Sequence, residues 1–589
     1  MSDRLTDRQS MLVAGIVQGA AMIVLHDGFV KHGLRAADLA WIAPCYALAV
    51  LGPLTFNMLR AEFTAGRSLL GAAVVALAVA ATAAWFGWAA VPAQDDATLL
   101  VGRASGLFVF GLSSAVAWFV ALPFVQGALR AGRLRYAYAQ LFDDAWRNAL
   151  LLNNCVVFAT VFWLLLALWA GLFAVLEMRF FVDLFSSRYF IYLATTLAIG
   201  FAVSMEERGA AATAALRRYL LAFQTRLLPL AALIVLLFVA ALPFAGLQPL
   251  WNTRHATPLL LCLQFALIAL ANAAWQDGAQ PAPFSAPVQW LVRAALALLP
   301  VLAALCVWSL SLRVRQYGWT VDRVWATVLV GFAALYGLGY ASSAAGRGWL
   351  PSLGRVNTGI ALALVATLLA IHSPLLDPQR IAAASQLARL LDGRIDAERF
   401  DYDHLRFELG RAGHAALAKL AAGAAHPESA LVGRRADEAL ARTRRGQRAP
   451  EVAPDGATIA RKLKIHPTDA RLDPTFVDHL ASRLEKKRID FDVSSLEGDK
   501  PVPLLLIELG GEVGAEAVLL APPYPVFSAD ARGWRQIGQL HFGASAPKPE
   551  QLAKLLEEGR YAAAPRGWRD LKLGEDEAFL SLQRGRRPD

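Results

Sequence analysis

The chain has 589 residues, of which 56% are hydrophobic and 18% are charged, with a formal net charge of +10 and a mean hydropathy of +0.43. About a quarter of the residues of an ordinary globular protein are charged, so this composition excludes a wholly soluble chain and indicates a membrane protein. Residues 1–376 carry 24 Lys and Arg against 15 Asp and Glu, and residues 377–589 carry 33 against 32, so the apolar part holds the positive excess and the C-terminal part lacks the basic patch of a nucleic-acid-binding domain.

A membrane-crossing helix needs about 20 mostly apolar residues. Apolar runs of this kind predict a mainly α protein, with a polytopic transmembrane bundle of about ten or eleven spans at residues 1–376. The weakest are the first, which ends in His26 and Asp27, and 189–205, which is short. The candidate spans are 11–30, 38–59, 68–91, 104–126, 150–176, 189–205, 227–248, 257–275, 288–312, 324–345 and 356–376.

Two arginine-rich loops predict the orientation. Both follow an even number of spans, so the positive-inside rule places the N-terminus in the cytoplasm. Eleven spans would then place residues 377–589 in the periplasm, and one miscounted span would reverse that side. The loop with Arg313, Arg315 and Arg323 disagrees, because it would be external. The residues of the two loops are Arg130, Arg133, Arg135 and Arg147, and Arg208, Arg217, Arg218 and Arg226.

Two segments near these loops have amphipathic patterns. Residues 133–148 and 207–226 could lie along the headgroups as surface helices. Alternatively, they could be extra turns of the neighbouring membrane helices. In the first span, the Gly15-x-x-x-Gly19 spacing could let another helix approach closely, although chance explains such a spacing equally well in an Ala-rich chain.

The composition changes after His372, which predicts an extramembrane part. Asp377-Pro378 has the pattern of an N-cap followed by proline at the first helical position. Residues 377–445 are predicted to be a helical segment, with helices at 378–392, 403–422 and 428–445. Residues 446–458 are predicted to be a linker, and 459–589 a small α+β domain. In that domain we expect helices at 473–487 and 549–558, and strands at 488–493, 502–509, 515–521, 535–542 and 577–583.

Three stretches resemble a known family. They are Leu141–Glu177, Ser311–Arg323 with its Arg-x-Tyr-Gly-Trp-Thr-x-x-Arg pattern from Arg315, and Ser373–Leu420. Together they resemble the bacterial inner-membrane family called domain of unknown function 4153, over most of residues 130–425. The resemblance implies a multi-span protein of the bacterial inner (plasma) membrane, and it implies no activity, cofactor or catalytic residue.

Two groups of residues are candidates for contacts beyond packing. Arg313, Arg315, Tyr317 and Arg323 could hold an anion or a lipid headgroup, whereas a shaped loop with anchoring arginines explains the same residues. Polar groups in membrane spans are costly and often functional, although groups at span ends also serve as interfacial anchors. The candidate intramembrane site comprises His26, Asp27, Arg103, Glu177, Arg179 and Asp183, and further polar residues in or near the spans are Gln18, Asn153, Asn154, Gln264, Asn272, Arg293 and His372.

No motif of a nucleotide-binding, hydrolytic or metal site occurs. Cys45, Cys155, Cys262 and Cys306 all fall in predicted spans, so they do not identify the compartment of the C-terminal part. We therefore expect no catalytic residue, cofactor or metal. The expected partners are the bilayer with its anionic headgroups and an envelope protein, and the oligomeric state is open.

These features favour a non-catalytic envelope protein that anchors an interaction domain. A transporter or lipid translocator is the second hypothesis, because about eleven spans are typical of transporters. A membrane-embedded transferase or hydrolase is the third, and would need clustered groups such as His26, Asp27 and Asp183.

Overall fold

The computed structural model describes residues 2–30, 38–91, 104–134, 136–248, 256–423, 425–442, 456–485, 501–509, 515–521, 524–530, 533–540, 549–563, 571–573 and 576–578. Contacts within the chain divide it into two compact units, Met1–Gly446 and Gln447–Asp589. The predicted helical segment 377–445 thus belongs to the same unit as the apolar helices. Most of the predicted linker 446–458 lies outside the described residues.

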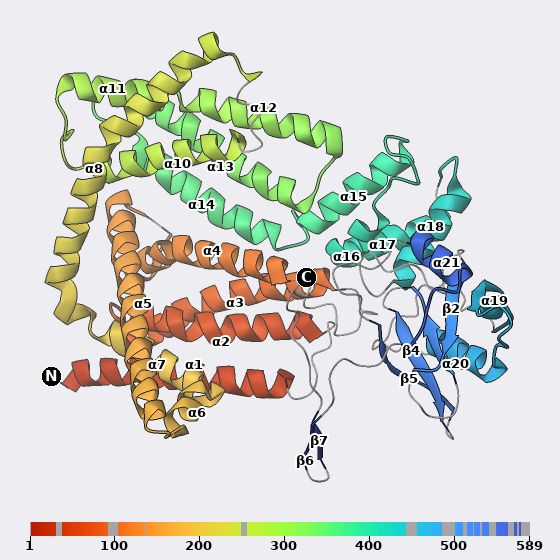
Figure 1. Ribbon diagram of the computed structural model, residues 1–589. Helices are drawn as coiled ribbons and strands as arrows, with labels where there is room; N and C mark the ends of the chain where they lie inside the picture. The colour runs from red at the N-terminus through yellow and green to blue at the C-terminus, as the bar shows by residue number, and fades with distance from the viewer. Residues whose placement is uncertain are drawn as a thin grey trace, which may run out of the picture. The chain divides into compact units, whose positions relative to one another are not determined.

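Helices are the only regular secondary structure in the described residues of the first unit (Figure 1). Its apolar helices are α1 (Ser2–Val30), α2 (Leu39–Arg60), α3 (Ala65–Ala90), α4 (Ala104–Ala131), α5 (Tyr138–Val175), α6 (Phe180–Ser186), α7 (Arg188–Ser204), α8 (Glu206–Ala245), α10 (Ala256–Trp275), α11 (Ala286–Ala297), α12 (Leu299–Tyr317), α13 (Val321–Ala345) and α14 (Leu353–Ile371).

These helices confirm the predicted fold class. Among the described residues, ten helical segments are long and apolar enough to cross a membrane, with α11 and α12 counted as one. The pair α6 and α7, bent by 69°, raises the number to eleven if it forms one span. The protein is therefore a multi-pass membrane protein, and each of the eleven predicted stretches falls on helix.

The helices bury apolar side chains inward and expose others outward, as lipid-facing helices do. On α3, Leu70 is 60% exposed and Leu77 is 61% exposed, while Ala83 is fully buried. One core lies among α1–α5 and α7, around Leu59 and Leu122. A second core lies among α8 and α10–α14, and its fully buried members include Leu267, Leu299, Leu302 and Tyr340.

Small residues bring α1 and α7 together as antiparallel neighbours. A Cβ on Gly15 would lie 2.8 Å from the Thr196 carbonyl oxygen, and one on Gly200 would lie 3.0 Å from that of Met11. The backbones approach closely because no side chain intervenes. The Gly15–Gly19 spacing thus forms a packing face.

The bundle has two ends, which contacts between helices define. At the first end, Asp7 near the N-terminus pairs with Arg60 at the end of α2. At the second end, Trp85 near the end of α3 donates a hydrogen bond of 3.2 Å to Asp377. Because α3 runs from one end to the other, the N-terminus and the segment after Ile371 lie at opposite ends (Figure 1).

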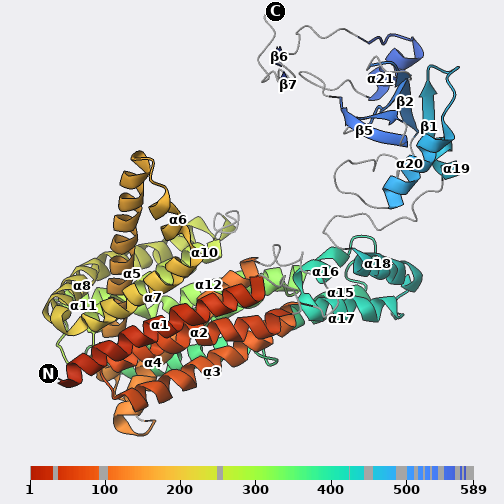
Figure 2. The ribbon, with the colours of Figure 1, turned by 90° about the horizontal axis from the view of Figure 1, so that it is seen from below.

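Two long helices combine the predicted amphipathic segments with apolar ones. Residues 138–148 open α5 and residues 207–226 belong to α8, so both are extra turns of neighbouring membrane helices. Figure 2 shows that α5 runs across the direction of α1–α4. Helix α8 bends along its length, and Pro229 inside it removes a backbone hydrogen bond, which is a common cause of bending.

Four shorter helices follow the bundle, and we call them the helical module: α15 (Pro378–Leu391), α16 (Tyr402–Glu408), α17 (Gly410–Ala421) and α18 (Ser429–Ala441). They share a core that includes Leu405, Leu417 and Val432. The prediction of one helix at 403–422 is wrong, because the chain breaks between α16 and α17, where Gly410 has a φ of +51°.

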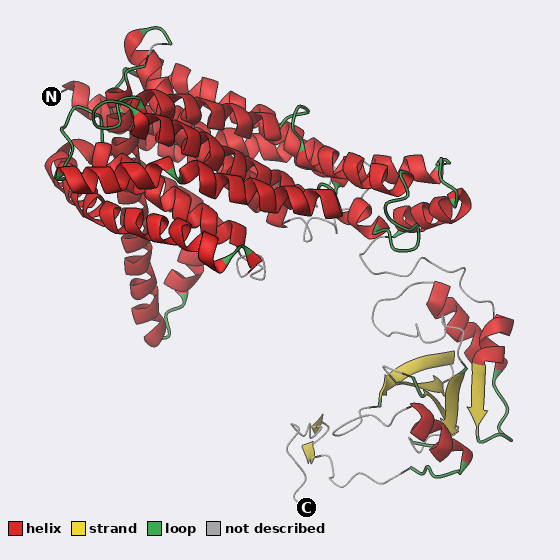
Figure 3. Ribbon diagram, turned by 90° about the horizontal axis from the view of Figure 1, so that it is seen from above, coloured by secondary structure: helices red, strands yellow, loops and turns green. Residues whose placement is uncertain are grey.

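The second unit contains a five-stranded sheet in the order β1-β2-β3-β4-β5 (Figure 3). Strands β1 and β2 are parallel, and the later pairs are antiparallel. Leu504 packs on one face of the sheet and Leu505 on the other, so both faces are covered. Its elements are α19 (Gly456–Lys462), β1 (Leu463–His466), α20 (Pro474–Glu485), β2 (Val502–Ile507), β3 (Glu516–Leu519), β4 (Pro525–Asp530), β5 (Gly533–Gln539) and α21 (Pro549–Glu557).

The sequence prediction missed several elements of this unit. Helix α19 and strands β1 and β4 were not predicted, and the expected strand 488–493 lies outside the described residues. A separate hairpin of β6 (Leu571–Leu573) and β7 (Asp576–Ala578) overlaps the start of the expected strand 577–583. The predicted α+β character is nevertheless confirmed.

Candidate functional site

The loop between α12 and α13 is fastened to the helical module. Gly318 ends α12 with a φ of +73°, and its neighbour Trp319 donates its backbone N–H to the Ser385 hydroxyl at 3.0 Å. Gln386 donates to the Trp319 carbonyl at 2.8 Å, and Arg389 donates to a carbonyl of the last turn of α12 at 2.9 Å. The loop therefore lies at the second end and holds α15.

The four predicted headgroup contacts belong to this loop. Arg323 donates to the Gly318 carbonyl at 2.7 Å and stacks its guanidinium over the Tyr317 ring at 5.4 Å. Arg313 and Arg315 are exposed on the last turns of α12. The structure thus gives Arg323 a role in shaping the loop, and leaves Arg313 and Arg315 facing outward.

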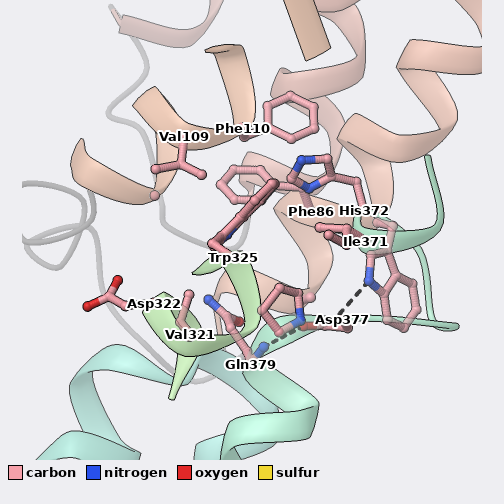
Figure 4. A pocket seen from close by; sticks show the side chains of 14 residues that line it. Phe86, Val109, Phe110, Val321, Asp322, Trp325, Ile371, His372, Asp377 and Gln379 are labelled. Atoms are coloured by element: carbon pink, nitrogen blue, oxygen red, sulfur yellow. Dashed lines mark hydrogen bonds between the residues drawn. The ribbon is translucent and has the colours of Figure 1, made fainter. Parts of the chain in front are cut away.

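An aromatic cavity of about 180 Å³ lies at the second end, where α3, α4, α13 and α14 meet α15 (Figure 4). The rings of Phe86 and Phe110 stack at 4.6 Å, and His372 meets Phe110 edge-on at 4.9 Å. Trp325 lies 5.7 Å from the His372 ring. Ser113 on α4 and the His372 Nε2 atom are 2.6 Å apart, so a hydrogen bond orients the imidazole.

Polar groups from α13 and α15 face these rings. In Figure 4, Asp377 and Gln379 lie across from the aromatic side chains, and Asp322 lies at the rim. Asp377 caps α15 by accepting the Gln379 N–H at 2.8 Å, and it also accepts the Trp85 indole N–H. Burial raises the pKa of the Asp377 carboxyl, and these N–H groups, with Arg380, oppose that rise.

A larger, more open cavity of about 630 Å³ shares Trp85, Asp377 and Gln379 with the first. Its other lining residues include Arg380, Arg411 and His414 from the module. The Arg411 guanidinium lies 4.7 Å from the centre of the Trp88 ring and donates to the Trp88 carbonyl. The two cavities therefore adjoin. They share Trp85, Asp377 and Gln379, and the second adds the basic side chains Arg380 and Arg411.

The predicted intramembrane polar site is dispersed among other contacts. Asp27 accepts a hydrogen bond of 2.8 Å from Tyr189 and pairs with Arg188 at 3.0 Å, while His26 and Tyr192 are 3.0 Å apart. These bonds tie α1 to α7. Glu177, Arg179 and Asp183 are exposed around the turn before α6, and Arg103 lies outside the described residues.

A polar network inside the second core was missed by sequence reasoning, which singled out only Asn272. Asn357 donates to Asn272 at 2.6 Å and to Tyr138 at 3.1 Å, and Tyr340 donates to Asn357 at 2.9 Å. The signal available was Asn357 itself, an amide one turn into the last span. Neutral amides and phenols in this arrangement hold the helices together and add no charge to the interior.

The first end holds an ion network instead. Glu62 accepts from Arg130 and from Arg147, the latter at 2.9 Å, and Arg130 also pairs with Asp144 at 3.1 Å. Arg217 pairs with Asp143 at 2.6 Å. Within the described ranges, no group of three His, Cys, Asp or Glu side chains could hold a metal ion.

Comparison with known proteins yields no relative. No family model matches the chain, and no curated protein or solved structure matches it either.

Proposed function

We propose that this chain is a non-catalytic, multi-pass protein of the bacterial inner membrane that holds an extramembrane interaction domain on the periplasmic side. The observation that carries the proposal is the fastening of α15 to the α12–α13 loop through Ser385, Gln386 and Arg389. Three side chains of α15, from two adjacent residues and one a turn later, bind this loop, so the module is joined to the bundle by more than its covalent connection.

Charge supports the orientation. The first end carries Arg60, Arg130, Arg147 and Arg217, which join Asp or Glu in ion pairs, and Arg133 is exposed in the nearby loop. Such an accumulation of arginine is typical of the cytoplasmic face, whereas Arg313, Arg315 and Arg323 at the second end do not follow this pattern. The N-terminus is then cytoplasmic, and the module at the opposite end is periplasmic.

The interior favours an anchor over an ion-coupled transporter. Asn272, Asn357, Tyr138 and Tyr340 form a neutral network, whereas coupled transport uses carboxylates or histidines along a pathway. Arg293 donates to the Ala344 carbonyl at 2.7 Å and so closes a helix end. Membership of the family that the sequence resembles is part of the same proposal.

The orientation is tested with paired reporters, one active only in the cytoplasm and one only in the periplasm. Fusions after residue 450 and at the C-terminus are compared with a control fusion after residue 134, at the first end. We expect periplasmic activity for the first two and cytoplasmic activity for the control. Cytoplasmic activity at residue 450 would refute the periplasmic assignment, and periplasmic activity of the control at residue 134 would then show that the bundle is inserted the other way round.

The anchoring role is tested by deletion. A chain ending after residue 446 keeps the bundle and the helical module, which form one compact unit. We expect it to insert normally and to fail to complement loss of the gene. Full complementation by this shortened chain would contradict the proposal, because the second unit would then have no role in function.

A further inference from the structure

The aromatic cavity at the second end has the features of a site for an organic cation. Trp85, Phe86, Phe110 and Trp325 contribute ring surfaces to its lining. The faces of aromatic rings, Trp above all, attract ammonium groups, most strongly when the site is shielded from water.

The cavity lining includes several acceptors. Asp322 and Asp377 supply carboxylates, and the Gln379 Oε1 atom is buried without a hydrogen-bond partner. A buried acceptor without a donor costs free energy, so a ligand that donates an N–H or O–H group to this oxygen would be favoured. An acyl chain would leave this oxygen unsatisfied.

The adjoining cavity is complementary in charge. Arg380 and Arg411 line it together with Asp377 and Gln379, which also border the aromatic cavity. Guanidinium groups are well suited to phosphate oxygens. A ligand that spans both cavities would carry an ammonium at one end and a phosphate next to it.

We propose that these two cavities bind the phosphoethanolamine headgroup of an aminophospholipid, with the ammonium among the rings of the aromatic cavity, which Asp322 and Asp377 border, and the phosphate at Arg380 and Arg411. The site lies where the α3, α4, α13 and α14 helices end, which is the depth of lipid headgroups. This proposal rests on the proposed function in one respect, which is that the chain spans a membrane. Binding in detergent does not depend on which face is periplasmic, so the two can fail separately.

The test titrates the purified full-length chain in a non-ionic detergent with short-chain phosphatidylethanolamine and with phosphatidylglycerol of the same chains, and counts bound lipid by native mass spectrometry. Phosphatidylglycerol keeps the phosphate and lacks the ammonium. We expect the Kd for phosphatidylethanolamine to be lower by about tenfold or more, as a buried charge pair requires. Soluble phosphoethanolamine, added alone, shows whether the headgroup suffices as a ligand or the lipid is needed.

Variants test the assigned groups. Asp322→Asn combined with Asp377→Asn removes both charges, and asparagine at 377 still caps α15. We expect this pair, and Trp325→Leu separately, to raise the Kd for phosphatidylethanolamine by about tenfold and to leave phosphatidylglycerol unchanged. Asp396→Asn, an exposed carboxylate of the module, is the matched control and should change neither.

Equal binding of the two lipids by the unaltered chain would overturn the proposal without any variant. An unchanged Kd in the double variant would also overturn it, because it would show that the carboxylates do not contact the ligand. Loss of both lipids in Trp325→Leu alone would indicate an acyl-chain pocket instead.

Discussion

The glycine at the end of α12 offers the sharpest test of how the helical module is held. Gly318 has φ +73° and ψ −176°, a region that is essentially restricted to glycine and costs other residues about 1–3 kcal/mol. A Cβ there would also lie 2.5 Å from the Cδ atom of Arg389 and 3.1 Å from the Ser385 hydroxyl. Gly318→Ala therefore strains the loop and displaces the two side chains that bind it.

The hydrogen bonds lost by this displacement add a free-energy cost of their own. Ser385 accepts the Trp319 N–H, and Arg389 donates to the Gln316 carbonyl, each bond contributing about 0.5–1.5 kcal/mol. Losing both lowers the free energy needed to open α15 by about 1–3 kcal/mol, beyond the strain itself. Backbone amides of α15 should then exchange about tenfold or more faster with deuterium.

A second glycine separates strain from contact. Gly246 ends α8 with φ +69° and ψ 176°, and a Cβ there would meet nothing within 4 Å. Gly246→Ala carries the same backbone strain without touching the module. Hydrogen–deuterium exchange of both variants in detergent is the assay, with peptides covering 378–391. Equal exchange rates of the α15 amides in the two variants would refute the docking argument. The contacts that Gly318→Ala displaces would then have no effect on α15 beyond that of backbone strain.

Three further predictions concern other regions. In α1, Gly15→Ala should lower stability by about 1–3 kcal/mol through overpacking. Gly28→Ala has open space around it and should raise helix stability by up to about 1 kcal/mol. Thermal unfolding in detergent would then show shifts of the unfolding temperature of opposite sign for the two variants. Asn148→Leu should cost about 1–3 kcal/mol because the buried Gln126 amide loses its partner, and the double variant with Gln126→Leu should cost less than the sum of the two, or the pair is not coupled. In the second unit, hydrogen bonds from Thr475 and Trp534 hold the pKa of Asp473 below its usual value. The contribution of Asp473 to stability is therefore present above about pH 4 and is lost as the pH falls through the lowered pKa. Asp473→Asn should remove this acid dependence from the hydrogen–deuterium exchange of that unit, and an unchanged pH profile would contradict the assignment.

The helices could be predicted from the sequence because length and apolarity alone determine a span. The bundle's polar contacts could not, because they join residues far apart in the chain. His372 could be singled out as a polar residue at a span end, yet its partner Ser113 lies 259 positions away. A serine inside an apolar helix carries no sequence signal, since it commonly bonds to its own helix, as Ser113 also does to Val109 at 2.7 Å.

The Arg-x-Tyr-Gly-Trp-Thr pattern shows the same limit in another form. One interpretation of this pattern from the sequence was a shaped loop with anchoring arginines. Its function in docking α15 was hidden, because the bonds from the module go to backbone carbonyls at Tyr317 and Trp319, which every sequence possesses. Likewise, β4 was missed because Pro525–Asp530 begins with proline, and only its pairing with β3 and β5 makes it a strand.

Asp377 connects the two conclusions drawn at the second end. Its carboxylate caps α15, accepts the indole N–H of Trp85 and lines both cavities. Asp377→Ala removes the cap that asparagine would keep, so it perturbs the docking of the module and the cavity together. Asp322 lines the cavity, and its side chain does not cap α15, so its substitution affects the cavity alone. Comparing the two carboxylates therefore separates what binds a ligand from what holds the module, because exchange of α15 should respond to position 377 and remain unchanged at position 322.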